Sequence, residues 1–394
     1  MKTMKYFVVG AMLSITATSM AQEVDFNTAL QPIAQAMKEN PTAVEKMAKT
    51  YMGQFKKDPN ALIALGSAYL TVKNFDKADE IADMVILKYK KDMAAQAEAY
   101  ILKGDIEAIK DQAGDGGSAA SHYATAMSLD PKNPQGYMRY AAVYRTISPK
   151  IVEQTYAKLR EELPNFPIDA EAAHSFFGGG LFAKAFENYA KCNLDQLDEA
   201  KLVEYVIAAF QTGKHADALK VATYGGNKFA KNATFAQLGM WSAVENKKFD
   251  EALKIAQRYF AMDGDKNATD YTYFGKAFLG AEQHTDALAQ FNKALEVSAD
   301  ATEPLARISE TYKKMGDEDK ALEYSEIYMQ KNPNASPSDY ANLAGIYAAK
   351  AEKGIDPAVN YKKSIGIYDK MAAKFPVIAS WAHMIAAGIA DKSG

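Results

Sequence analysis

Two short stretches of the sequence have residue types that bind phosphate or a metal ion in other proteins. The run FFGGGLF, with glycine at positions 178 to 180, has the composition of a phosphate-binding loop. No lysine followed by serine or threonine comes after it, and it falls where the two helices of a hairpin must be joined. We therefore predict a turn there and no phosphate site.

The run DGDKNATDY begins like a calcium-binding loop, with oxygen-bearing side chains at Asp263, Asp265 and Asn267. Such a loop needs glycine at its sixth position and glutamate at its twelfth. Those positions hold Ala268 and Phe274 instead. We therefore expect no calcium site in this run.

Histidine is a frequent metal ligand and acid–base group, and this sequence has five of them. They are dispersed along the chain, at His122, His174, His215, His284 and His383. No two have the spacing of zinc ligands on one helix, and nothing in the order of residues nominates a nucleophile with its base. The sequence predicts no catalytic residue, no metal and no cofactor, and a protein that is not an enzyme.

The composition indicates a folded chain with a large core. Of its 394 residues, 48% are hydrophobic and 24% are charged. The formal net charge of -3 argues against nucleic acid as a partner, because proteins that bind a phosphate backbone usually carry a basic face. Cys192 is the one cysteine, so no disulfide can form within the chain, and we expect its side chain to be a buried filler.

The first residues have the order of a secretory signal. Lys2 and Lys5 precede an apolar run over residues 6–15, and small and polar residues follow up to Ala21. We predict cleavage after Ala21 and a periplasmic or secreted protein; the alternative is that residues 6–15 form a buried first helix. No later stretch has the run of about 18 apolar residues that a transmembrane helix requires.

The strongest signal in the sequence is a repeat of nearly fixed length. Alanines at the same place in similar segments lie at Ala218, Ala252, Ala287 and Ala321, separated by 34, 35 and 34 residues. Apolar or small residues recur four and seven positions after them, which is one stripe of a helix. A period of this size predicts stacked helix pairs.

Each of these helices is preceded by a partner helix with a pattern of its own. A large residue is followed by a very small one and then, three positions on, by an aromatic residue, as in Phe274, Gly275 and Phe278. The small residue lets the two helix axes approach, and the aromatic ring fills the space beside it. Aspartates at positions 76, 217, 250, 286 and 319 are predicted to cap the second helices, and prolines at 59, 131, 164, 333 and 376 to follow them.

Together these features resemble the tetratricopeptide repeat. The residues that carry the resemblance in one unit are Phe274, Gly275, Phe278, Ala287, Phe291 and Ala294. The resemblance implies an all-α fold, an α-solenoid of antiparallel helix pairs wound into a right-handed superhelix. We expect a signal peptide over residues 1–21, about ten helix pairs over residues 22–376, and a C-terminal helix over residues 377–394 that caps the apolar end of the stack.

The resemblance also implies an inner groove, lined by the first helices, in which such proteins hold peptides or other proteins. The residues expected on this groove are Met138, Arg145, His174, Phe177, Ile207, Phe210, Lys276, Leu279, Glu310 and Lys313. The alternative for Phe177, Ile207 and Phe210 is that they pack between repeats. The pattern by which one subset of the family holds the tails of chaperones is absent, since Glu303, one turn before Arg307, would repel a carboxylate.

Two functions fit the sequence. The first is an exported adaptor or scaffold that binds a protein or peptide along the groove. The second is a cell-envelope structural protein, or a factor associated with carbohydrate or peptidoglycan, in which Trp241, Tyr271 and Tyr273 stack on sugars. Neither the identity of the partner nor the oligomeric state follows from the sequence.

Overall fold

The computed structural model describes residues 25–39, 41–110 and 116–393. Within these ranges the regular elements are 21 α-helices and two short 3-10 helices, with no strand. The chain divides into two compact units between Cys192 and Asn193. The predicted all-α architecture is confirmed, whereas the predicted signal over residues 1–21 lies outside the described residues.

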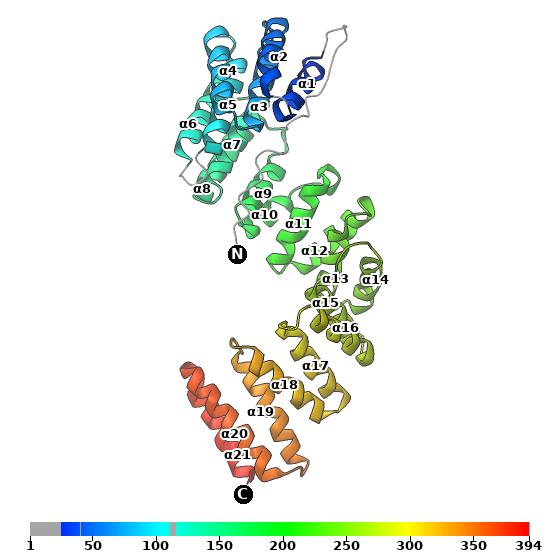
Figure 1. Ribbon diagram of the computed structural model, residues 1–394. Coiled ribbons are helices and arrows are strands. Elements are labelled where there is room, and N and C mark those ends of the chain that lie inside the picture. The colour runs from blue at the N-terminus through cyan, green and yellow to red at the C-terminus, as the bar shows by residue number, and fades with distance from the viewer. Residues whose placement is uncertain (1–24, 40, 111–115, 394) are drawn as a thin grey trace. The chain divides into compact units, whose positions relative to one another are not determined.

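Unit 1 contains the first ten α-helices, which pack in chain order (Figure 1). They are α1 (Phe26–Glu39), α2 (Pro41–Gln54), α3 (Pro59–Thr71), α4 (Phe75–Lys88), α5 (Met93–Lys110), α6 (Gly117–Leu129), α7 (Pro134–Tyr144), α8 (Pro149–Glu162), α9 (Ile168–Gly178) and α10 (Phe182–Tyr189).

Unit 2 contains the remaining helices, which also pack in chain order. They are η1 (Leu194–Gln196), α11 (Glu199–Gln211), α12 (His215–Lys228), α13 (Ala233–Glu245), α14 (Phe249–Phe260), α15 (Ala268–Gly280), α16 (His284–Val297), α17 (Thr302–Met315), α18 (Glu318–Lys331), α19 (Pro337–Glu352), α20 (Pro357–Lys374), η2 (Pro376–Ile378) and α21 (Ala379–Ser393).

Helix pairs are the building block of both units. Each odd-numbered helix from α1 to α19 packs on the even-numbered helix that follows it. First helices of successive pairs also contact one another, as α11 does with α13, α13 with α15, and α15 with α17. One layer of unit 2 is therefore made of first helices, and side chains from neighbouring pairs meet there.

The repeated alanines are fully buried on the second helices of their pairs. Ala218, Ala252, Ala287 and Ala321 belong to the second helices α12, α14, α16 and α18, and each is 0% exposed. A methyl group at these positions lets the second helix approach its partner, because any longer side chain would enlarge the interhelical distance. The predicted period therefore marks one buried position of each second helix.

The turn inside most pairs has one repeated conformation. A residue with positive φ closes the first helix at Lys73, Gly180, Gly213, Lys247, Glu282, Gly316 and Gly354. The N–H group of the next residue then donates to the carbonyl oxygen five positions earlier, as Lys214 does to Ala209 at 2.8 Å. The turn predicted at FFGGGLF is confirmed, since Leu181 donates to Phe176 in the same way at 2.9 Å.

These turns correct the predicted helix caps. The aspartates at 76, 217, 250, 286 and 319 lie inside the first turn of the second helices. The second helices begin one or two residues before these aspartates. The N-cap positions are therefore Asn74, Lys214, Lys248, Gln283 and Asp317. The aspartate carboxylates keep a favourable interaction with the positive end of the helix dipole, but they do not cap.

At the C-terminal end of unit 2, α21 packs on α20. Ala382 and Ala386 face the core and are buried, whereas Trp381 and Met384 are 46% and 61% exposed. None of the described helices combines the length and the apolar character needed to cross a bilayer.

Candidate functional site

Three aromatic side chains from successive first helices of unit 2 form one contact cluster. The ring centroid of Trp241 on α13 lies 5.8 Å from that of Phe210 on α11 and 5.1 Å from that of Tyr273 on α15. The rings of Trp241 and Tyr273 are nearly parallel, with an interplanar angle of 18°. All three side chains are half-buried, so they stabilise the packing between helix pairs and contribute to the surface.

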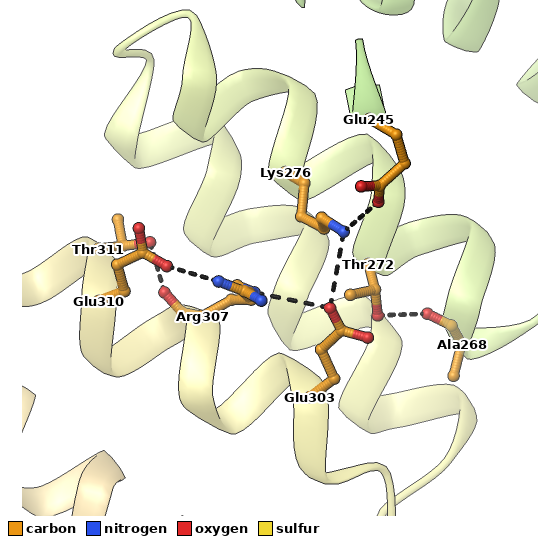
Figure 2. A network of polar contacts seen from close by, with 8 residues as sticks. All are labelled: Glu245, Ala268, Thr272, Lys276, Glu303, Arg307, Glu310 and Thr311. Carbon is orange, nitrogen blue, oxygen red and sulfur yellow. Dashed lines mark hydrogen bonds and ion pairs between the residues drawn. The ribbon is translucent and has the colours of Figure 1, made fainter. Parts of the chain in front are cut away.

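An ion-pair network begins beside this aromatic cluster, where the Nζ atom of Lys276 lies 4.2 Å from the ring centroid of Tyr273. The same Nζ atom lies 2.9 Å from Glu245 and 3.7 Å from Glu303 (Figure 2). Partial burial disfavours the charged form of Glu245, but the hydrogen bond and charge of Lys276 outweigh this effect and lower the pKa of Glu245. Lys276 therefore connects α13, α15 and α17 as a cation between two carboxylates.

Arg307 extends the network along α17. Its Nε atom lies 3.6 Å from Glu303, and its Nη1 atom lies 2.8 Å from Glu310. Burial disfavours the charged guanidinium, but Glu310 and Glu303 outweigh it and raise the pKa of Arg307. Glu303, one turn before Arg307, is thus paired with both Lys276 and Arg307.

Beyond Arg307, an open cavity of about 530 Å³ lies between α17, α18 and α19. We call it the α17–α19 groove. It is lined by Thr302, Glu303, Ala306, Arg307, Ser309, Glu310, Lys313, Ser325, Tyr328, Met329, Asp339, Asn342 and Ile346.

The lining of the α17–α19 groove is mostly polar. Met329 is half-buried, and Ile346, at 5% exposed, adds almost no apolar surface. The carboxylate of Asp339 accepts hydrogen bonds from Ser336 at the N-terminus of α19 and is thus already engaged. Lys313 and Asn342 are exposed, and neither side chain has a polar partner among the described residues.

The residues predicted for the groove in unit 2 have different environments. Phe210 belongs to the aromatic cluster and packs between helix pairs, and Lys276 belongs to the ion-pair network. Glu310 and Lys313 line the α17–α19 groove. Ile207 is half-buried on α11, with Phe210 one turn further along the helix.

Leu279 is a core residue, and its expected place on the groove surface was wrong. It is 5% exposed and packs in a cluster with Ala287, Phe291 and Ile308. Consecutive positions of a helix differ in direction by about 100°, so the prediction placed this residue on the wrong side of α15.

The residues predicted for the groove in unit 1 lie on α7 and α9 or at the end of α7. Met138 and Arg145 are half-buried, and His174 is exposed. Phe177 is half-buried, with its ring in edge contact with that of Phe182 at 5.5 Å. This contact joins the two helices of its own pair across their turn.

Sequence reasoning missed several groups that shape the site of unit 2. Glu245 was not singled out, and Asn342 was not recognised as a free amide beside a cavity. Their signal in the sequence is weak: each lies on the exposed face of a first helix, as many structural polar residues do. The partner of Glu245 is Lys276, which is 31 residues away in the sequence.

The aromatic residues considered for sugar stacking do not present one open platform. One face of Tyr273 is covered by Trp241, and the Nζ atom of Lys276 lies over the ring at 4.2 Å. The Trp241 ring and the Lys276 ammonium group therefore lie on different faces of the Tyr273 ring, and neither face is open to a sugar. Tyr271 contacts Phe260 instead, at 5.0 Å between ring centroids.

Within the described ranges, no three histidine, cysteine, aspartate or glutamate side chains gather as metal ligands. Asn267, from the calcium-like run, caps α15 and accepts a hydrogen bond from the Asp270 backbone at 3.1 Å. Cys192 is half-buried, and burial raises the pKa of its thiol to about 11.

Comparisons with known proteins find no matching family description and no matching curated protein. Among solved structures, the chain is similar to the C-terminal part of a TPR repeat-containing protein from Cytophaga hutchinsonii, with 14% identity over 61% of this chain and 95% of that one (TM-score 0.46). YrrB, described as a TPR protein with an unusual peptide-binding site, has 18% identity over 53% of this chain and 97% of its own (TM-score 0.38). MamA has 17% identity over 45% and 94% (TM-score 0.38). The fold assigned above rests on the helix pairs themselves.

Proposed function

We propose that this chain is an exported interaction module that binds a protein or peptide partner along the first-helix layer of unit 2. The observation that carries the proposal is the α17–α19 groove, where the unengaged polar groups of Lys313 and Asn342 lie beside half-buried Met329. A peptide offers both backbone amides and apolar side chains, which are the groups that such a surface can bind.

The length of the groove is sufficient for a short peptide segment. Its lining residues on α17 extend from Thr302 to Lys313. At 1.5 Å per residue this corresponds to roughly 16 Å, which is the length of about five residues of extended chain.

The test is site-specific photo-crosslinking in the cell that makes the protein. A crosslinking amino acid replaces Lys313 or Asn342, and the matched control replaces Lys293, an exposed residue on the second helix α16. We expect the same partner to be captured from positions 313 and 342, and not from position 293. Capture of the same proteins from all three positions would contradict the proposal.

The site of action is part of the same proposal. The order of residues 1–21 supports export and cleavage after Ala21, giving a periplasmic or secreted protein. Cell fractionation with sequencing of the mature amino terminus tests this. A product that retains Met1 in the cytoplasm would exclude export, while the groove could still be tested separately.

The alternative, an envelope structural protein or a carbohydrate-associated factor, makes a different prediction. The full chain would sediment with purified peptidoglycan sacculi, whereas a peptide-binding module would stay in solution. The covered faces of Trp241 and Tyr273 do not favour sugar stacking in unit 2.

A further inference from the structure

Arg145, in unit 1, differs from the other arginines of the chain. The sequence has five arginines. Arg139, Arg160 and Arg307 lie 2.7, 2.7 and 2.8 Å from carboxylate oxygens, and Arg258 is exposed to solvent. Arg145 is half-buried, and it has no carboxylate partner among the described residues.

Two glycines of FFGGGLF lie against Arg145. A Cβ atom on Gly178 would lie 3.1 Å from the Nη1 atom of Arg145, and one on Gly179 would lie 2.5 Å from its backbone carbonyl oxygen. Arg145 ends α7, and the Gly178 contact places its guanidinium against the C-terminal turn of α9. A helix C-terminus carries roughly half a negative charge, which favours a cation there without neutralising it.

The surroundings do not supply the missing charge. Burial lowers the pKa of Arg145, and the influence of Tyr156, which raises it, is the smaller effect. The opposite result holds for Arg307, whose pKa is raised because two glutamates surround it. A guanidinium stays protonated in a protein, so Arg145 is a partly desolvated cation that lacks a counter-ion.

We infer that Arg145 binds a carboxylate of the partner, either an acidic side chain or a chain terminus. This inference rests on the proposed function and names the ligand chemistry for unit 1. The guanidinium offers a planar fork of N–H donors that a carboxylate accepts in pairs. His174, one turn before Gly178 on α9, is exposed.

The experiment follows the side-chain Nε signals of the full chain labelled with ¹⁵N-arginine, of which there are five. One probe is hexaglutamate with both ends blocked, a second is pentaalanine with a free carboxyl terminus, and the control is blocked hexaglutamine. We expect the Arg145 signal to move with one or both acidic probes and to saturate at a concentration about tenfold lower than the signal of Arg258. Which probe acts distinguishes a side-chain carboxylate from a terminal one.

Two variants sharpen the result. Arg145→Lys keeps the charge but loses the fork, and we expect weaker binding of the acidic probe; Arg258→Gln, at the exposed arginine, is expected to leave it unchanged. The inference is overturned if Arg145 responds no more strongly than Arg258, or equally to hexaglutamine. That outcome would leave crosslinking from the α17–α19 groove unaffected, so the two proposals fail separately.

Discussion

The ring of Phe291 occupies the space where a side chain at Gly275 would lie. A Cβ atom built on Gly275 would come within 2.4 Å of Phe291 Cε1 and 2.6 Å of Cδ1. The two residues belong to the first and second helices of one pair, α15 and α16. The fully buried ring therefore packs against the bare backbone of α15, and the pair owes its close approach to this contact.

Replacement of Gly275 by alanine should destabilise unit 2. The added methyl group must displace a ring that is 0% exposed, which costs about 1 to 3 kcal/mol through overpacking. The matched control is Gly345→Ala on α19, where nothing lies within 4 Å of the added atom and helix propensity predicts a gain of up to about 1 kcal/mol. Urea unfolding followed by tryptophan fluorescence measures both. Equal effects of the two substitutions would refute the close contact.

The same contact shows why the helix pairs were predictable from the sequence. Each pair is held by residues that recur locally, such as Gly275, Phe291 and Ala287, so a period of about 34 residues reveals them. Such patterns report which residues of two adjacent helices touch, because the turn between the helices is short.

Features that depend on backbone geometry or on neighbouring pairs were less predictable. Lys247 and Glu282 adopt positive φ because the helix must end there, although neither residue type favours it. Leu279 was assigned to the wrong face of α15, and the α17–α19 groove depends on the spacing between two pairs, which no single helix encodes.

The repeated turn yields a second prediction. Glu282, with φ of 61°, lies in the left-handed region that glycine adopts without strain. We expect Glu282→Gly to raise the free energy of unfolding by about 0.5 to 1 kcal/mol and Gly213→Ala to lower it by about 1 kcal/mol. No atom lies within 4 Å of a Cβ at Gly213, so its cost would come from the backbone alone. Denaturation midpoints that shift in the same direction for both variants would contradict this account.

The buried alanine stripe yields a third prediction. Ala287 is 0% exposed on α16, whereas Ala289, two residues further along, is exposed. We expect Ala287→Leu to lower the free energy of unfolding by about 1 to 3 kcal/mol and Ala289→Leu to change it by less than about 0.5 kcal/mol. Thermal melts followed by circular dichroism distinguish the two. An unchanged melt for Ala287→Leu would remove the basis for the predicted helix contact.

Glu98 gives unit 1 a defined pH dependence. Its carboxylate accepts a hydrogen bond from Asn133 at 2.7 Å, but burial dominates and raises the pKa of Glu98. In the unfolded chain a glutamate has a pKa of about 4.3. Between that pH and the higher pKa of the folded protein, Glu98 keeps a proton in the folded state that it has released in the unfolded state. Stability should therefore fall as the pH rises from the unfolded to the folded pKa of Glu98.

The variant Glu98→Gln isolates this effect. Below the unfolded pKa both proteins carry a neutral group at position 98, and their stabilities should differ by a constant amount. As the pH rises through the window, the wild type should lose stability relative to Glu98→Gln. Urea unfolding at a series of pH values measures the difference. If the difference in free energy of unfolding between the two proteins does not depend on pH, or if the wild type gains stability as the pH rises, burial does not raise the pKa of Glu98.

The fifth prediction separates binding from packing in unit 2. The side chains of Lys313 and Asn342 are exposed and make no polar contact with the described residues. The double variant Lys313→Glu, Asn342→Ala should therefore change the free energy of unfolding by less than about 0.5 kcal/mol. Phe210→Ala removes a ring that contacts Trp241 and Tyr273, and we expect a loss of about 1 to 3 kcal/mol, less than for a fully buried phenylalanine.

The double variant should reduce partner capture more than Phe210→Ala does, although it costs less stability. The measurement is the yield of the adduct from a crosslinking residue at Thr302, which lines the α17–α19 groove. The double variant at Lys313 and Asn342 should reduce this yield strongly, because it reverses a charge and removes the free amide that a peptide backbone would bind. Phe210→Ala should reduce it only in proportion to the loss of folded protein. If the double variant captures the partner as well as the wild type does, the groove is not where that partner binds.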